Sequence, residues 1–348
     1  MKNKLFYVII IVLFIFSSCS AASKFDKKQK NVLNSFILDY NIMYKNPKKN
    51  YITKKYNIKL PYEQSFWSSM QDFNINNEQY FLGPTLFNGY IFNISKKEVF
   101  YRAKEKRKYY DMDFYDNKNA YMINRGRQEV YNLKNGKLNH KYKIEAKGNL
   151  LLEFNNNYIM DNSSGNLDDK NLYIYDKKFE LKRKIMDKVK YNKFNEQINE
   201  NLNIPILLEK YDNKIIFVYE NLNKYNIYSD NYNLLKSGKF FNKMEINPVK
   251  KEDVYTGRVN YIKHGFIETA DIDNGKNIYF ILSRKRRKKK LYLYKYNLKT
   301  NNLDSVALSS KKDIFVNLIK VKNNNLYIIF DFSTQMIIKI EDIKKYFN

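Results

Sequence analysis

Residues 291–308 read LYLYKYNLKTNNLDSVAL: a strand-like run of aromatic and aliphatic residues, a polar turn, and a second run that contains Leu. From about residue 80, short runs of this kind, rich in Tyr, Phe, Ile and Val, alternate with polar residues and turns, which is typical of β-strands. The same order recurs in EVYNLKNGKLNHKYKI (129–144), LYIYDKKFELKRKI (172–185) and YNIYSDNYNLLKSGKF (225–240). The sequence therefore contains a repeated strand–turn–strand unit.

A further strand pattern precedes each copy, and two less regular units lie near 80–104 and 314–340. The clearest predicted strands are 89–95, 120–124, 171–176, 214–220, 277–283, 291–297 and 325–331. Aligning the copies on Tyr131, Tyr175, Tyr228 and Tyr294 gives spacings of 44, 53 and 66 residues. A four-stranded propeller blade takes roughly 40–50 residues, and additional length in surface loops costs little free energy.

These repeats predict an all-β fold, a β-propeller of about six irregular blades. One four-stranded sheet cannot bury both of its faces, whereas sheets stacked around an axis can. The alternative is a β-sandwich or an open β-rich fold in which the hairpins resemble one another by chance.

The amino-terminal residues Met1 to Cys19 read MKNKLFYVIIIVLFIFSSC. Two lysines precede a run of twelve apolar residues, which is too short to span a membrane and suits the central region of a signal peptide. The segment Phe16-Ser17-Ser18-Cys19 resembles a bacterial lipoprotein signal, with Phe where Leu is usual, as in the spirochaetal version. The resemblance implies cleavage after residue 18 and acylation of Cys19, with palmitate as the expected fatty acid. The alternative is an ordinary signal peptide with a cysteine there by chance.

The mature chain is expected to have two parts. Residues 19–50 would form a lipidated tether and a short amphipathic helix near 29–44, because apolar residues recur there at helical spacing. This helix would pack on the main domain or meet a partner or the bilayer surface. Residues 51–348 would form the propeller. The lipid at Cys19 would be the membrane attachment, since no later apolar run reaches about eighteen residues.

The composition is strongly basic, with 63 Lys and Arg against 36 Asp and Glu and a formal charge of +27. Abundant Lys, Asn, Ile and Tyr with little Ala is also the amino-acid usage expected of an AT-rich genome. The alternative is therefore that part of the positive charge reflects mutational bias and not selection for an acidic partner. The most basic stretch is a run of seven cations, predicted to form a hairpin loop: Arg284, Lys285, Arg286, Arg287, Lys288, Lys289 and Lys290. An exported lipoprotein meets no nucleic acid, which leaves anionic headgroups or an acidic protein surface as ligands. The alternative is a solvated loop that discourages aggregation.

Signals of catalysis are weak, so we expect a protein that is not an enzyme and has no cofactor and no metal site. One Cys and two His exclude disulfide frameworks and leave little material for a metal site or a His base. We expect His140 to be a solvated residue of a turn-like segment and His264 to lie in a turn. The segments DMDFYD (111–116) and DIDNG (271–275) are predicted to be strand edges and turns, with Asn274-Gly275 as the tight corner of the second. A carboxylate pair in these segments would be the alternative.

The lipobox and the repeats over about 80–341 together resemble BamB-like lipoproteins, accessory subunits of the outer-membrane β-barrel assembly complex. The family's tryptophan-rich repeats are missing, because Trp67 is the only Trp of the chain. The resemblance implies a non-enzymatic scaffold in the cell envelope, anchored in the outer membrane facing the periplasm and in contact with barrel-assembly proteins. The alternatives are a surface or periplasmic propeller that binds a glycan or polyanion, and an enzyme that acts in the central channel. A cluster of carboxylates at one channel mouth would favour the enzyme.

Overall fold

The computed structural model describes most of the repeated region and only short pieces before residue 112. The described residues are 45–46, 49–50, 52–58, 70–76, 79–84, 90–93, 98–102, 112–114, 119–124, 128–134, 137–163, 168–192, 194, 196–241, 249–252, 259–262, 267–274, 276–282, 290–309, 316, 318–330, 335–340 and 342–347. The predicted signal peptide 1–18, Cys19 and the helix near 29–44 lie outside them.

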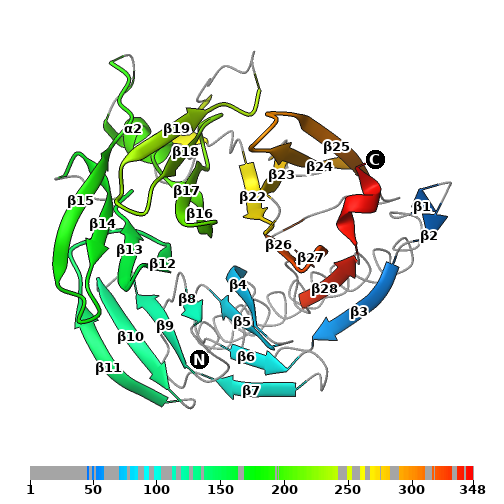
Figure 1. Ribbon diagram of the computed structural model, residues 1–348, viewed down its shortest axis with the longest axis horizontal. Helices are drawn as coiled ribbons and strands as arrows, with labels where there is room; N and C mark the ends of the chain where they lie inside the picture. Colours follow the sequence, from blue (N-terminus) through cyan, green and yellow to red (C-terminus); the bar gives the residue numbers. More distant parts are fainter. Residues whose placement is uncertain are drawn as a thin grey trace, which may run out of the picture.

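The described strands form six four-stranded antiparallel sheets, arranged around a common centre (Figure 1). The first three sheets are β4 (Met70–Asn76), β5 (Gln79–Pro84), β6 (Tyr90–Asn93) and β7 (Glu98–Arg102); β8 (Met112–Phe114), β9 (Asn119–Asn124), β10 (Glu129–Lys134) and β11 (Lys137–Lys143); and β12 (Leu151–Phe154), β13 (Asn157–Asp161), β14 (Lys170–Tyr175) and β15 (Leu181–Asp187). The next two are β16 (Pro205–Tyr211), β17 (Lys214–Tyr219), β18 (Tyr225–Tyr228) and β19 (Leu234–Gly238); and β22 (Ile267–Ile272), β23 (Asn277–Leu282), β24 (Lys290–Asn297) and β25 (Leu303–Ser309). The prediction of an all-β fold is confirmed.

The last sheet joins the two ends of the chain. It contains β26 (Leu318–Lys322), β27 (Asn325–Phe330), β28 (Gln335–Ile340) and, as its outermost strand, β3 (Ile52–Ile58). Residue Gln335 of β28 pairs with Ile58 of β3. The innermost strands β4, β8, β12, β16, β22 and β26 contact one another in this order, and β26 contacts β4. The ring of sheets is therefore closed, with its last sheet held together by strands from both ends of the sequence.

The remaining elements lie between or beside these sheets. They are the hairpin of β1 (Lys45–Asn46) and β2 (Lys49–Asn50), helix α2 (Glu196–Leu202), the hairpin of β20 (Val249–Glu252) and β21 (Val259–Ile262), and the 3-10 helix η1 (Ile343–Tyr346). In the described part of the chain no helix has the length and apolar character needed to cross a bilayer.

The hydrophobic core lies between successive sheets. One cluster joins the sheets β8–β11 and β12–β15, a second joins β12–β15 and β16–β19, and a third joins β16–β19 and β22–β25. These clusters cover both faces of the sheets β12–β15 and β16–β19, and Ile215 to Tyr219 of the second strand β17 are fully buried. The repeat in the sequence is thus a repeat of sheets that must stack to bury their apolar surface.

The turns between third and fourth strands carry aromatic side chains into these interfaces. Phe179 and Tyr232 have positive φ values of 60° and 64°, a conformation that costs a bulky residue free energy. Phe179 stacks on Tyr158 at 4.5 Å and touches Tyr121 of the preceding sheet, while Asn157 of the preceding sheet donates a 2.8 Å hydrogen bond to the Tyr232 hydroxyl. Contacts between the sheets therefore offset the backbone strain.

A glycine at the entry to the third sheet gives a direct stability prediction. A Cβ on Gly148 would lie 1.8 Å from the carbonyl oxygen of Asp161, a distance that backbone atoms cannot tolerate. We expect Gly148→Ala to lower the free energy of unfolding by about 3 kcal/mol or more, measured by denaturant titration. Lys178→Ala, in an exposed turn of the same sheet, is the control and should change it by about 0.5 kcal/mol or less. Equal stabilities would contradict the close approach.

Candidate functional site: the loop face

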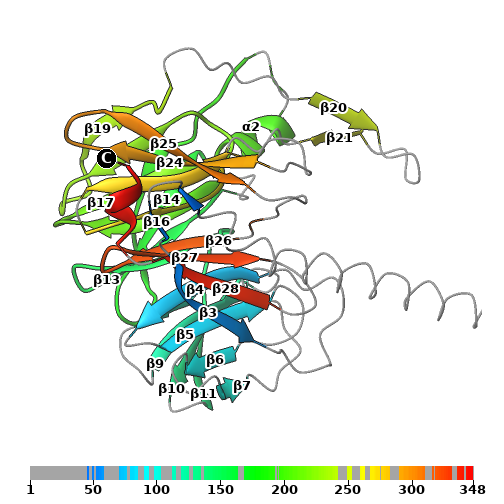
Figure 2. The same cartoon turned by 90° about the vertical axis from the view of Figure 1, so that its right-hand side faces the viewer.

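The strand directions divide the connections of the ring between two faces. Connections from second to third strands, and from each sheet to the next, join strand ends on one face, which we call the loop face; the other connections form the turn face. The loop face has residues 59–69, 85–89, 103–111, 125–128, 144–150, 162–169, 188–204, 220–224, 239–266, 283–289, 310–317 and 331–334. The turn face has residues 77–78, 94–97, 115–118, 135–136, 155–156, 176–180, 212–213, 229–233, 273–276, 298–302 and 323–324. Figure 2 shows α2 and the β20–β21 hairpin on the same side of the ring.

The two faces differ in charge. The loop-face connections contain 26 Lys and Arg against 14 Asp and Glu, whereas those of the turn face contain seven of each. Lys and Arg make up a similar share of both sets, 26 of 113 residues and 7 of 37, so the sets differ mainly in their carboxylates. The excess of cations belongs to connections outside the described residues, because the described loop-face residues hold seven cations and seven carboxylates.

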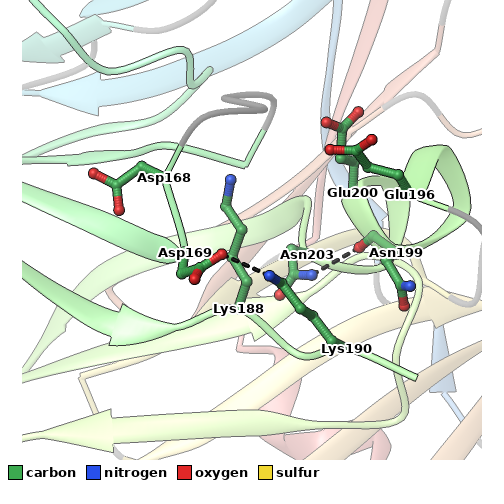
Figure 3. A pocket seen from close by; sticks show the side chains of 8 residues that line it. All are labelled: Asp168, Asp169, Lys188, Lys190, Glu196, Asn199, Glu200 and Asn203. Carbon is green, nitrogen blue, oxygen red and sulfur yellow. Dashed lines mark hydrogen bonds and ion pairs between the residues drawn. The ribbon is translucent and has the colours of Figure 1, made fainter. Parts of the chain in front are cut away.

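A pocket of about 300 Å³ opens on the loop face (Figure 3). It is lined by the loop before β14 and by the connection that contains α2: Asp168, Asp169, Lys188, Lys190, Glu196, Asn199, Glu200 and Asn203. Two asparagines fix the wall. The Asn203 amide exchanges hydrogen bonds of 2.8 and 2.9 Å with the backbone of Val189, and the Asn199 side chain accepts a 2.9 Å bond from the Tyr191 amide. The pocket is therefore held by short-range polar contacts.

The pocket carries charges of both signs. Lys190 and Asp169 form an ion pair of 2.6 Å. Burial lowers the pKa of Lys188, and burial together with the neighbouring carboxylate of Glu196 raises the pKa of Glu200. Burial acts against ionisation of Asp168, but hydrogen bonds from the Tyr173 hydroxyl, the Lys170 amide and Lys184 lower its pKa to about 2. The arrangement suits a polar surface contact, and the described residues contain no group of three or more His, Cys, Asp or Glu suited to a metal ion.

A second group of charges joins three innermost strands near the centre of the ring. The Lys320 ammonium of β26 lies 3.5 Å from a carboxylate oxygen of Asp271 on β22 and 3.5 Å from one of Glu209 on β16. The other oxygen of Asp271 accepts a hydrogen bond from the Val321 amide, and the Thr269 hydroxyl accepts one from the Ile319 amide at 3.0 Å. Side chains two residues apart on β22 thus bind alternate amides of β26. These contacts link the three strands. Glu209 is the most accessible residue of the group, with about a third of its side chain exposed.

This group predicts a pH dependence of stability. Burial raises the pKa of Asp271 to about 6, although Lys320 opposes the shift and Glu209 adds to it. The folded state therefore binds a proton more readily than the unfolded state, whose Asp pKa is near 4, so this carboxyl stabilises the fold increasingly as the pH falls from 7 toward 4. Between pH 7 and pH 5 the gain is about 1 kcal/mol. Asp271→Asn removes the titration, so its unfolding free energy relative to wild type should change by that amount between these pH values, and a gap independent of pH would contradict the assignment.

The residues predicted from the sequence are only partly within the described chain. Lys290 is the first residue of β24, and the other six cations of the basic run lie outside the described residues, as do Cys19, Asp111, Asp116 and His264. Strands β23 and β24, which flank the basic run in the sequence, pair as antiparallel neighbours. That the run forms a hairpin loop with a contact surface stays a prediction.

The structure describes further residues that the sequence analysis singled out, among them His140, Asp271 and Asp273. His140 is solvent-exposed as expected, but it lies on β11 rather than in a turn, because the hairpin turn falls earlier, between β10 and β11. Asp273 begins the predicted turn between β22 and β23, and its amide donates a 3.0 Å hydrogen bond to the Asn277 carbonyl. Asp271 is part of the group at the centre of the ring, which the sequence analysis missed together with the pocket. The available signal was the pair of polar residues Thr269 and Asp271, two positions apart on one predicted strand face.

Comparison with known proteins gives the fold. No protein-family model and no curated protein matches the sequence. Among solved structures, an inactive histidine-to-alanine virginiamycin B lyase from Staphylococcus aureus in complex with quinupristin has a TM-score of 0.55 at 7% identity, over 82% of this chain and 99% of that one. A DUF4221-family protein from Bacteroides vulgatus has a TM-score of 0.53 at 10% identity, over 82% and 96%. A candidate exported protein from Bacteroides fragilis has 0.52 at 11% identity, over 83% and 95%. At these identities the likeness concerns the propeller-like fold alone.

Proposed function

We propose that this chain is an exported, lipid-anchored propeller of six blades that acts as a docking platform and not as an enzyme. The observation that carries the proposal is the sequence of the loop-face connections, which holds 26 cations against 14 carboxylates, with half of the excess in residues 284–289, whereas the turn-face connections hold seven of each. A rigid ring with one basic face suits a protein that holds an acidic partner in a fixed orientation.

The lipid anchor and the location rest on the amino-terminal sequence. Cleavage before Cys19 and its acylation would hold the chain on the outer membrane, facing the periplasm. Our finer proposal is an accessory role in outer-membrane protein assembly, with a barrel-assembly protein as the partner. It is supported by the lipobox, the blade repeats and the resemblance to BamB-like lipoproteins.

The second candidate function is catalysis or ligand binding at the centre of the ring, favoured by the pair of carboxylates on Glu209 and Asp271. We give it less weight because Lys320 bridges both carboxylates and Asp271 also bonds the β26 backbone. These bonds give Glu209, Asp271 and Lys320 a structural role, because they hold the innermost strands of adjacent sheets together. A surface lipoprotein that binds a glycan or polyanion remains the third candidate, and it would use the same basic face.

Site-specific photocrosslinking in intact cells tests the platform proposal. A crosslinking amino acid at Glu196, exposed on α2 of the loop face, should give a discrete adduct with an envelope protein. The same amino acid at Lys178, exposed on the turn face, is the matched control and should give none. Adducts from Lys178 alone, or from neither position, would contradict docking through the loop face.

A further inference from the structure

The outer strands of the sheets offer a second surface, and one of them differs from the outer strands of the two preceding sheets. Strand β19 is the last strand of its sheet and pairs with β18 along one edge. Within the described residues no strand pairs with its other edge. Free edges of this kind accept additional strands, and most proteins protect them with charged or polar side chains.

Five outer strands carry a register shift that places one extra residue outside the strand pairing: Thr53 in β3, Phe100 in β7, Asn139 in β11, Lys182 in β15 and Leu235 in β19. The structure describes the side chains of the last three, which can be compared residue by residue. Asn139 bonds the Lys134 carbonyl, and Lys182 pairs with Asp176 at 2.9 Å. In β19 the same position holds a leucine that is 54% exposed.

The residue before the bulge shows the same difference. In β15 it is Leu181, which packs against the aromatic cluster around Phe179. In β19 it is Leu234, which is 56% exposed. Two adjacent leucines therefore stand at the free edge of β19, where the neighbouring blades have a packed leucine and a polar residue. Their side chains expose apolar surface to water, and a bound partner would cover this surface.

The surroundings of this edge select the partner by charge. Lys236 lies on β19, where its ammonium donates hydrogen bonds to the Leu298 carbonyl and the Asn301 side chain, and Lys239 follows the strand. The guanidinium of Arg183 on the adjacent sheet contacts the Asn231 carbonyl, and Asp230 lies in the turn before β19. A second copy of the chain, with a formal charge of +27, would be repelled. An acidic strand would instead bring carboxylates to these cations.

We propose that the free edge of β19 is a docking site for an extended acidic segment of another protein, which adds to the sheet as a fifth strand. Backbone hydrogen bonds would give affinity, while apolar side chains at alternate positions would cover Leu234 and Leu235. The inference rests on the proposed platform function and names a second contact for it, at the rim of the ring.

The test uses the full chain in detergent micelles and synthetic nine-residue peptides followed by fluorescence anisotropy. A peptide with alternating Val and Glu should bind, and one with alternating Val and Lys should bind at least tenfold more weakly. A Val–Glu peptide with a central Pro, which removes a ladder donor, should also lose at least tenfold. The double variant Leu234→Ser/Leu235→Ser should lose at least tenfold for the first peptide, whereas Lys182→Ser at the equivalent bulge should retain it.

Thermal unfolding and the conservative pair Leu234→Met/Leu235→Met serve as folding controls, and the Met pair should retain binding. Equal binding of the Val–Glu peptide by wild type and the double Ser variant would overturn the proposal. So would equal binding of the Pro peptide, or self-association of the wild type that the Ser variant abolishes, since a second copy would then be the occupant. If the Val–Glu peptide does not bind β19 but Glu196 still crosslinks to a partner, the β19 proposal fails and the loop-face proposal stands.

Discussion

Replacing Cys19 with alanine is expected to move most of the protein from the membrane fraction to the soluble periplasmic fraction. Two or three acyl chains anchor stably, at about 0.8 kcal/mol for each buried CH₂, whereas a protein without them has only its surface charge to hold it. Detergent-phase partitioning of cell fractions measures the change. Because partial retention could come from the basic loop face, the fractions should also be washed in high salt.

Two controls make the Cys19 result specific. Ser18→Ala keeps a small residue before the cysteine and should leave the protein in the membrane fraction. Metabolic labelling with a palmitate analogue should mark the wild type and Ser18→Ala and not Cys19→Ala. Membrane retention of Cys19→Ala after the salt wash would require a different anchor.

Neutralising the basic run is expected to produce the largest change in binding to an anionic surface. Replacing Arg286, Arg287, Lys288 and Lys289 with Ser removes four charges from the loop face. At about 1 kcal/mol for each cation near an anionic bilayer, the association constant would fall by up to about a thousandfold at low salt. The loss should shrink as salt rises, because screening shortens the range of the interaction to about 8 Å at physiological ionic strength.

The measurement is co-sedimentation with phosphatidylglycerol vesicles, using the Cys19→Ala form so that the lipid anchor does not contribute. A matched control replaces four turn-face cations, Lys96, Lys97, Lys178 and Lys299, with Ser, which changes the net charge equally. The thermal midpoint should stay nearly unchanged in both, since exposed charges contribute little to folding. Equal losses in the two variants would mean that total charge matters and the face does not. No loss in either would identify the basic run as a solvated hairpin.

Much of the fold follows from short-range patterns in the sequence. Tyr131, Tyr175, Tyr228 and Tyr294, aligned by the repeat, lie on the third strand of four different sheets. Each of these strands carries aromatic and aliphatic residues and is followed by a polar turn, so the pattern is visible without knowledge of neighbouring strands.

The innermost strands were harder to predict. Strand β12 has four residues, and half of β22 is polar, including Thr269 and Asp271, whose side chains bond the neighbouring strand β26. The pairing of β3 with β28 joins opposite ends of the chain, which local periodicity cannot reveal. The pocket was missed for the same reason, since Asp169 and Lys190 come together only when the sheet has formed.

The central claim is that the chain works as a platform held in a complex, and native purification tests it most directly. The tagged full-length protein is extracted from envelopes in mild detergent, and its assemblies are sized and identified by mass spectrometry. The account predicts a stoichiometric complex with an outer-membrane barrel-assembly protein, which the Arg286, Arg287, Lys288 and Lys289 to Ser variant forms less well and the turn-face control forms normally. Recovery of the wild type alone as a monomer, with no partner stabilised by crosslinking at Glu196, would contradict it.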